Sequence, residues 1–133
     1  MPKKFELIYI IDDDAIFVKI TTRLLQLAGI CDNFLVFKNG QEALDYIKPR
    51  LINSESLADM ILLDINMPVM DGWEFLDNLK IVPNSEKLNI NLISSSIDPL
   101  DIQKAESYDL IKNFLTKPIS VDKLKSLSIV NNS

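Results

Sequence analysis

Short apolar runs alternate along the chain with longer segments that carry apolar residues at helical spacing. Each run is four to seven residues long and is bounded by polar or turn-forming residues, which is typical of a strand buried on both faces. The pattern predicts five strands, at residues 5–11, 33–37, 59–63, 89–93 and 110–115. It predicts a helix after each strand, at residues 15–28, 41–48, 73–80, 99–108 and 121–127.

Local signals mark the ends of several of these helices. In the first helix, one face carries four apolar residues, and Gly29 supplies a stop: Ile16, Ile20, Leu24 and Leu27. Pro49 is expected to end the second helix, which makes Arg50 to Leu57 a loose polar connection. Asp98 and Ser120 are predicted to cap the last two helices, and the polar tail at 131–133 is expected to fray.

Five strands that each precede a helix predict an α/β fold with a parallel sheet. A chain of 133 residues is too short for an eight-fold barrel, which needs about 250 residues. We therefore expect a doubly wound, five-stranded, flavodoxin-like sheet in the order 2-1-3-4-5. The length favours a single domain over residues 1–133, with its core at about 5–127 and no output domain.

Composition excludes several classes of function. The chain contains no histidine and a single cysteine, Cys31, which excludes a Ser-His-Asp triad, a Cys-His dyad and histidine-based or cysteine-cluster zinc sites. The net charge of −5 argues against a nucleic-acid surface. No apolar stretch approaches the ~20 residues of a membrane span, and no signal peptide is evident, so a cytoplasmic location is predicted.

Polar side chains follow four of the predicted strands at the point where each strand ends. Asp12 and Asp13 follow the first strand, and Asp64 follows the third. Ser94 and Lys117 follow the fourth and fifth. Ligands bind at the carboxyl ends of such strands, at the switch between strands 1 and 3. Carboxylates of this kind hold Mg²⁺, a lysine and a serine suit phosphoryl oxygens, and an aspartate can itself accept a phosphoryl group.

Taken in this order, the motifs resemble the receiver domain of two-component response regulators, the family that includes the chemotaxis regulators. The likeness covers residues 5–127. It is carried by an acidic pair, a phospho-acceptor motif, a switch hydroxyl and a Lys-Pro pair: Asp12-Asp13, Asp64 within Leu62 to Gly72, Ser94, and Lys117-Pro118. The neighbouring Ser95 is an alternative for the switch hydroxyl, although its spacing from Asp64 fits less well than that of Ser94.

The resemblance implies a phosphorelay function. A partner histidine kinase or histidine phosphotransfer protein would bring phosphohistidine to Asp64, with Mg²⁺ on Asp12, Asp13, Asp64 and the backbone carbonyl of Asn66. Phe114 falls at the position of the family's rotating aromatic residue. The signal would reach a downstream protein through the face formed by the fourth helix, fifth strand and fifth helix. The resemblance is compatible with a monomer or a phosphorylation-dependent dimer, and implies a signalling domain rather than an enzyme.

Two alternatives remain at this point. The run Asp12-Asp13-Asp14 fits the Asp-x-Asp signature of haloacid-dehalogenase-like phosphatases, with Asp12 as nucleophile and Asp14 as acid. That scheme leaves the Asp64 motif without a role, and in the receiver interpretation Asp14 is exposed or caps the first helix. The second alternative is an unphosphorylated scaffold, which has no need of an acceptor, an acidic pair and a lysine.

Overall fold

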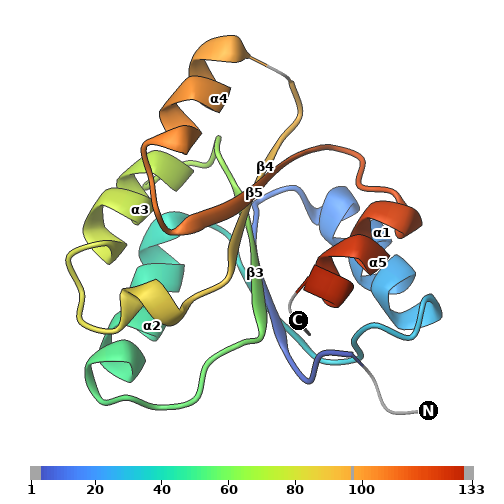
Figure 1. Cartoon of the computed structure of the whole chain (residues 1–133), viewed down its shortest axis with the longest axis horizontal. Coiled ribbons are helices and arrows are strands. Elements are labelled where there is room, and N and C mark those ends of the chain that lie inside the picture. The colour runs from blue at the N-terminus through green and yellow to red at the C-terminus, as the bar shows by residue number, and fades with distance from the viewer. Residues whose placement is uncertain (1–3, 97, 131–133) are drawn as a thin grey trace.

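A five-stranded parallel sheet lies between two layers of helices in the computed structural model, which describes residues 4–96 and 98–130 (Figure 1). The strands are β1 (Ile8–Ile11), β2 (Phe34–Phe37), β3 (Met60–Asp64), β4 (Ile90–Ser94) and β5 (Ile111–Thr116). Their order is β2-β1-β3-β4-β5, which confirms the predicted topology. The predicted first strand was too long, since Phe5 donates its backbone N–H to Ile30 outside the sheet.

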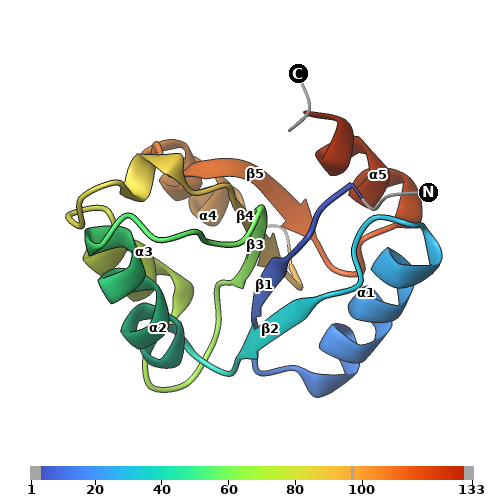
Figure 2. The same cartoon turned by 90° about the horizontal axis from the view of Figure 1, so that it is seen from below.

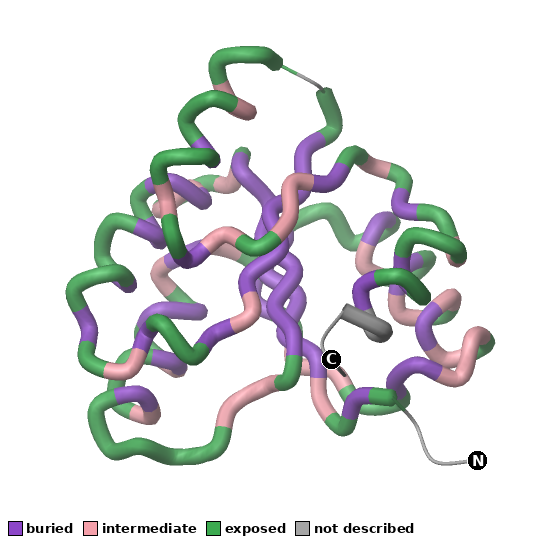
Figure 3. The backbone as a smooth tube through the Cα atoms, in the orientation of Figure 1, coloured by how far each residue is buried: buried purple, intermediate pink, exposed green. Residues whose placement is uncertain are grey.

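The helices divide between the two faces of the sheet (Figures 1 and 2). On one face lie α2 (Gly40–Ile52), α3 (Gly72–Leu79) and α4 (Pro99–Glu106), and on the other lie α1 (Ala15–Leu27) and α5 (Val121–Val130). A short 3-10 turn, Ser85–Lys87, precedes β4. Each face has its own apolar core, and the buried backbone is concentrated in the central strands (Figure 3).

Most helix starts follow the expected capping chemistry. Asp14 accepts hydrogen bonds from the N–H groups of Ile16 and Phe17, so it is the cap of α1. Asp98 caps α4 with Pro99 at its first position, and the Ser120 hydroxyl accepts from the N–H of Lys123. The tail at 131–133 lies outside the described residues.

The prediction that Pro49 ends the second helix was wrong. Helix α2 continues through Pro49 to Ile52, so the loose connection starts after the helix rather than at Arg50. Ile47 and Leu51 are buried on either side of the proline, and their packing outweighs the missing N–H. Arg50 also reaches back to donate a hydrogen bond to the carbonyl of Tyr46 at 2.9 Å.

Three of the four apolar residues identified on one face of the first helix are exposed, and the fourth, Leu24, is half-buried against the core. Ile16, Ile20 and Leu27 are 73%, 52% and 69% exposed, whereas the buried residues of α1 are Phe17, Thr21 and Leu25. Apolar residues occur on two neighbouring faces of this helix, so spacing by itself does not choose between them. Docking against β1 and α5 buries the second face and leaves the first as a surface feature.

Candidate functional site

The carboxyl ends of β1 and β3 bring three acidic side chains together. Asp12 and Asp13 follow β1, Asp64 is the last residue of β3, and one carboxylate oxygen from each lies within 4.8 Å of the others. Asp12 and Asp64 are buried, whereas Asp13 is exposed. The adjacency of β1 and β3 at the centre of the sheet produces this cluster from residues more than fifty positions apart in sequence.

Asp12 is the most constrained of the three acids. Its Oδ1 accepts a hydrogen bond from the N–H of Asp14 at 2.9 Å. Its Oδ2 lies 2.8 Å from Nζ of Lys117 but has no partner among the described residues in hydrogen-bonding geometry. This buried oxygen could ligate a cation, which would compete with Lys117 for it.

Burial and crowding disfavour the charged form of these carboxyls. Burial, reinforced by the neighbouring Asp12 carboxylate, raises the pKa of Asp64 to about 6. Burial also raises the pKa of Asp12, although Lys117 and the N–H of Asp14 oppose the shift. The cluster therefore stores electrostatic repulsion at neutral pH, and a bound cation would relieve it.

The donor set fits a hard divalent cation. Three carboxylates gathered at one edge, one of them exposed, offer oxygen ligands and leave room for water, which is what Mg²⁺ requires. We take Asp12, Asp13 and Asp64 as the residues that would hold it. Asn66 is exposed in the loop that follows β3, so the role of its backbone carbonyl stays a prediction.

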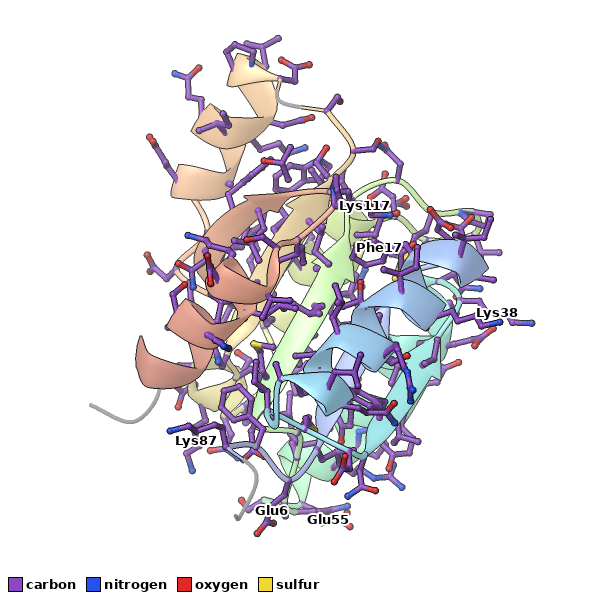
Figure 4. All side chains as sticks on the ribbon, turned by 90° about the vertical axis from the view of Figure 1, so that its right-hand side faces the viewer. Glu6, Phe17, Lys38, Glu55, Lys87 and Lys117 are labelled. Carbon is purple, nitrogen blue, oxygen red and sulfur yellow. The ribbon has the colours of Figure 1, made fainter. Side chains whose placement is uncertain are left out.

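Lys117, labelled in Figure 4, lies within 4 Å of three acidic side chains. Besides the 2.8 Å pair with Asp12, its Nζ is 3.8 Å from Asp64 and 3.9 Å from Asp14. Its backbone N–H donates to the carbonyl of Ser94 at 2.8 Å, which ties the ends of β4 and β5 together. The bond from Lys117 to Pro118 is cis. The distances from Nζ to Asp12 and Asp64 show that the lysine faces the acids, as the strand order predicts.

The two proposed switch residues lie on neighbouring strands. Ser94 is buried at the end of β4, where its hydroxyl donates to the carbonyl of Ser96 at 2.7 Å and accepts from the N–H of the same residue. Ser95, the alternative, is exposed. Phe114 is half-buried in β5 and lines a groove of about 220 Å³ between β5 and α4.

Two contacts of the site were missed by the sequence analysis. Asp14 reaches Lys117 as well as capping α1, and the ring of Phe17 lies beneath Nζ of Lys117, with its centroid 4.4 Å away. The rule that strand ends meet at one edge identifies residues that follow strands, but both of these belong to the start of a helix. The run of three consecutive acids could have identified Asp14 as a site residue. No sequence feature identified Phe17.

Gly72 lies directly against the backbone at the end of β3. A Cβ at this position would lie 2.6 Å from the carbonyl oxygen of Asp64 and 3.0 Å from Cα of Ile65. We expect Gly72→Ala to lower the free energy of unfolding by roughly 1–3 kcal/mol, because backbone cannot move aside as a side chain can. Urea unfolding would measure this, and an unchanged midpoint would contradict the tight packing.

Comparisons with known proteins agree with this geometry. The response regulator receiver domain family matches residues 8–128, so the chain belongs to that family. A probable chemotaxis protein CheY of Rhizobium etli is 29% identical over 90% of this chain and 86% of its own length. A hybrid signal transduction histidine kinase B of Dictyostelium discoideum is 33% identical over 88% of this chain and 6% of its own length. The crystal structure of a two component response regulator from Cytophaga hutchinsonii is 29% identical, with a TM-score of 0.87 and 98% of each chain covered.

Membership of this family defines the class of the site. The protein is a phospho-acceptor signalling domain rather than an enzyme, and it carries the acidic pocket and lysine typical of receivers. Receiver domains pair with histidine kinases. The phosphatase alternative loses its support, because the carboxylate of Asp14 caps α1. Across the described residues, no helix combines the length and apolar character needed to cross a membrane.

Proposed function

We propose that this receiver accepts a phosphoryl group on Asp64 from the phosphohistidine of a partner histidine kinase or histidine phosphotransfer protein. The observation that carries the proposal is the placement of the buried Asp64 carboxylate beside two further acids and a lysine. Nζ of Lys117 lies 3.8 Å from Oδ1 of Asp64. With a pKa of about 6, Asp64 is mainly a carboxylate at neutral pH and therefore able to act as a nucleophile.

Each side chain of the pocket has a distinct task in the transfer. An oxygen of Asp64 attacks the phosphorus atom, the new O–P bond forms, and the N–P bond breaks as the imidazole leaves with its electron pair. Lys117 pairs with the negative oxygens of the moving group. When bound to Asp12, Asp13, Asp64 and the Asn66 carbonyl, Mg²⁺ supplies charge neutralisation. Because the chain itself has no histidine, the donor must be another protein or a small phosphodonor.

Phosphorylation then acts as a switch. To reach a phosphoryl group on Asp64, the Ser94 hydroxyl has to give up its 2.7 Å hydrogen bond to Ser96, which would alter the loop between β4 and α4. Phe114 can follow, because it is half-buried beside α4 and lacks a hydroxyl that would fix it. The face formed by α4, β5 and α5 is the surface that would pass this change to a downstream protein.

The exposed apolar residues of α1 support a protein donor. Helix α1 begins directly after the acids, and Ile16 and Ile20 project from its exposed face. Exposed Lys19 and Arg23 lie beside them, so a donor with apolar and acidic side chains would fit. A membrane or nucleic-acid partner is not part of the proposal, and a cytoplasmic location and a monomer or phosphorylation-dependent dimer stay predictions.

Intact-mass analysis tests the acceptor. Incubation with acetyl phosphate and Mg²⁺ is expected to add one phosphoryl group to the wild-type protein, and Asp64→Ala is expected to abolish the gain because it removes the nucleophile. Omission of Mg²⁺ should also suppress it. A gain that persists in Asp64→Ala and disappears in Asp12→Ala would instead support the phosphatase scheme. If neither acetyl phosphate nor a phosphorylated histidine donor increases the mass of the protein, the result would support the unphosphorylated scaffold.

A further inference from the structure

We propose that Phe17 is a positioning residue for Lys117, which it holds over the acidic pocket through the face of its ring. The ring centroid lies 4.4 Å from Nζ, well within the range of a cation–π interaction. Figure 4 shows the two labelled side chains together at the end of the molecule where α1 begins. The inference rests on the proposed function, because it concerns the lysine of that same phosphoryl-transfer site.

The environment makes this contact stronger than its counterpart at an open surface. Phe17 is 7% exposed and the side chain of Lys117 is 13% exposed, so little water competes with the ring for the ammonium group. Cation–π contacts gain strength as the cation loses water. The Asp14 cap at the start of α1 accepts from the N–H of Phe17, which fixes the backbone below the ring.

The ring of Phe17 can hold Lys117 in place when a cation occupies the acids. Nζ of Lys117 lies 2.8 Å from Oδ2 of Asp12, and Asp12 is also one of the expected cation ligands. A cation on that carboxylate would compete with the ammonium group and weaken this pair. The face of Phe17 carries no formal charge and is not a ligand, so it would keep Lys117 near Asp64 in the metal-loaded state.

A role in packing alone is the competing explanation, because Phe17 also belongs to the core beneath α1 and α5. Phe17→Leu retains an apolar side chain but removes the aromatic face, and Phe17→Tyr restores the face. Phe37→Leu is a matched control. Phe37 is similarly buried, at 8% exposed, but it lies in the core on the opposite face of the sheet.

Phosphorylation kinetics provide the first test. With acetyl phosphate at saturating Mg²⁺, we expect Phe17→Leu to lower the phosphorylation rate by about 3- to 30-fold, the range that loss of a shielded cation–π contact allows. The Mg²⁺ concentration for half-maximal rate should stay unchanged, since the acids are untouched. Phe17→Tyr should recover most of the rate, and Phe37→Leu should keep it. Equal losses in the two leucine variants would overturn the proposal.

A double-mutant cycle tests the contact without any phosphorylation. In Mg²⁺-free urea unfolding, Phe17→Leu should shift the midpoint less in a Lys117→Met background than in the wild type, because part of its effect is the lost contact. Additive shifts would overturn the proposal. If Phe17→Leu does not fold, Phe17→Met replaces it. A wild type that accepts no phosphoryl group would refute the proposed function, whereas the cycle would still decide the role of Phe17.

Discussion

Replacing Lys117 with methionine is expected to destabilise the Mg²⁺-free protein by about 3 kcal/mol at neutral pH, because it leaves a buried charge unpaired. The side chain of Asp12 is 0% exposed, and Lys117 is 2.8 Å from its Oδ2. Methionine keeps most of the length and apolar stem of lysine. The loss of stability is therefore due to the missing charge and its contacts more than to packing. The same variant should fail to accept a phosphoryl group at a measurable rate.

The destabilisation caused by Lys117→Met is expected to depend on pH. Without Lys117, protonation of Asp12 and Asp64 stabilises the folded protein. The destabilisation caused by Lys117→Met should therefore become smaller as the pH falls toward 5. Urea unfolding in EDTA at pH 7 and pH 5 would measure it. Asp12→Asn in the Lys117→Met background should recover part of the stability, and Lys112→Met, at an exposed lysine on β5, is the control. A penalty that is small at pH 7 would contradict the buried pair.

Asp64→Asn is expected to have the opposite effect, stabilising the Mg²⁺-free protein by about 2–3 kcal/mol at pH 7. The pKa of Asp64 is raised from 3.8 to about 6, chiefly by burial and then by Asp12. The folded protein therefore binds this proton more tightly than the unfolded chain does. The stabilisation from the protonated carboxyl is complete below about pH 4 and is lost as the pH rises through 6.

Parallel denaturation curves from pH 4 to pH 8 would test this difference. The wild type and Asp64→Asn should agree in stability near pH 4, diverge up to about pH 6, and differ by a constant amount above it. Asp101→Asn, which replaces an acid away from the cluster, should give no comparable divergence. Mg²⁺ should then stabilise the wild type more than Asp64→Asn, because it binds the folded cluster. A pH-independent difference would show that the raised pKa of Asp64 is not what lowers the stability of the wild type.

Burial and crowding of the acidic side chains are part of the chemistry of this site. Three acids in one place are expected to reduce the stability of the fold without a cation, and the same three acids are the proposed cation ligands and include the proposed nucleophile. Lys117 offsets part of the repulsion through its contacts with Asp12 and Asp64. A substitution that relaxes the cluster is therefore expected to stabilise the protein and to remove its capacity for phosphoryl transfer.

The positions of the main site residues were predictable from sequence because they follow strands. In a parallel sheet the carboxyl ends of all strands lie at one edge, so Asp12, Asp64 and Lys117 meet whatever the details of side-chain packing. Helix starts were equally predictable where a polar residue precedes the first turn, as at Asp98. The meeting of strand ends and the capping of helix starts both follow from backbone hydrogen bonding. Capping depends only on neighbouring residues, and the sheet edge depends only on the order of the strands.

Tertiary packing decided what local pattern left open. Pro49 reads as a helix end, yet burial of Ile47 and Leu51 carries α2 past it. In α1 two apolar faces compete, and only docking on the sheet buries Phe17 while leaving Ile16 exposed. The sequence by itself determined the strand order and the acidic cluster through backbone geometry. The rotation of α1, which brings an aromatic ring beneath Lys117, depends on side chains distant in sequence and was decided by the tertiary structure.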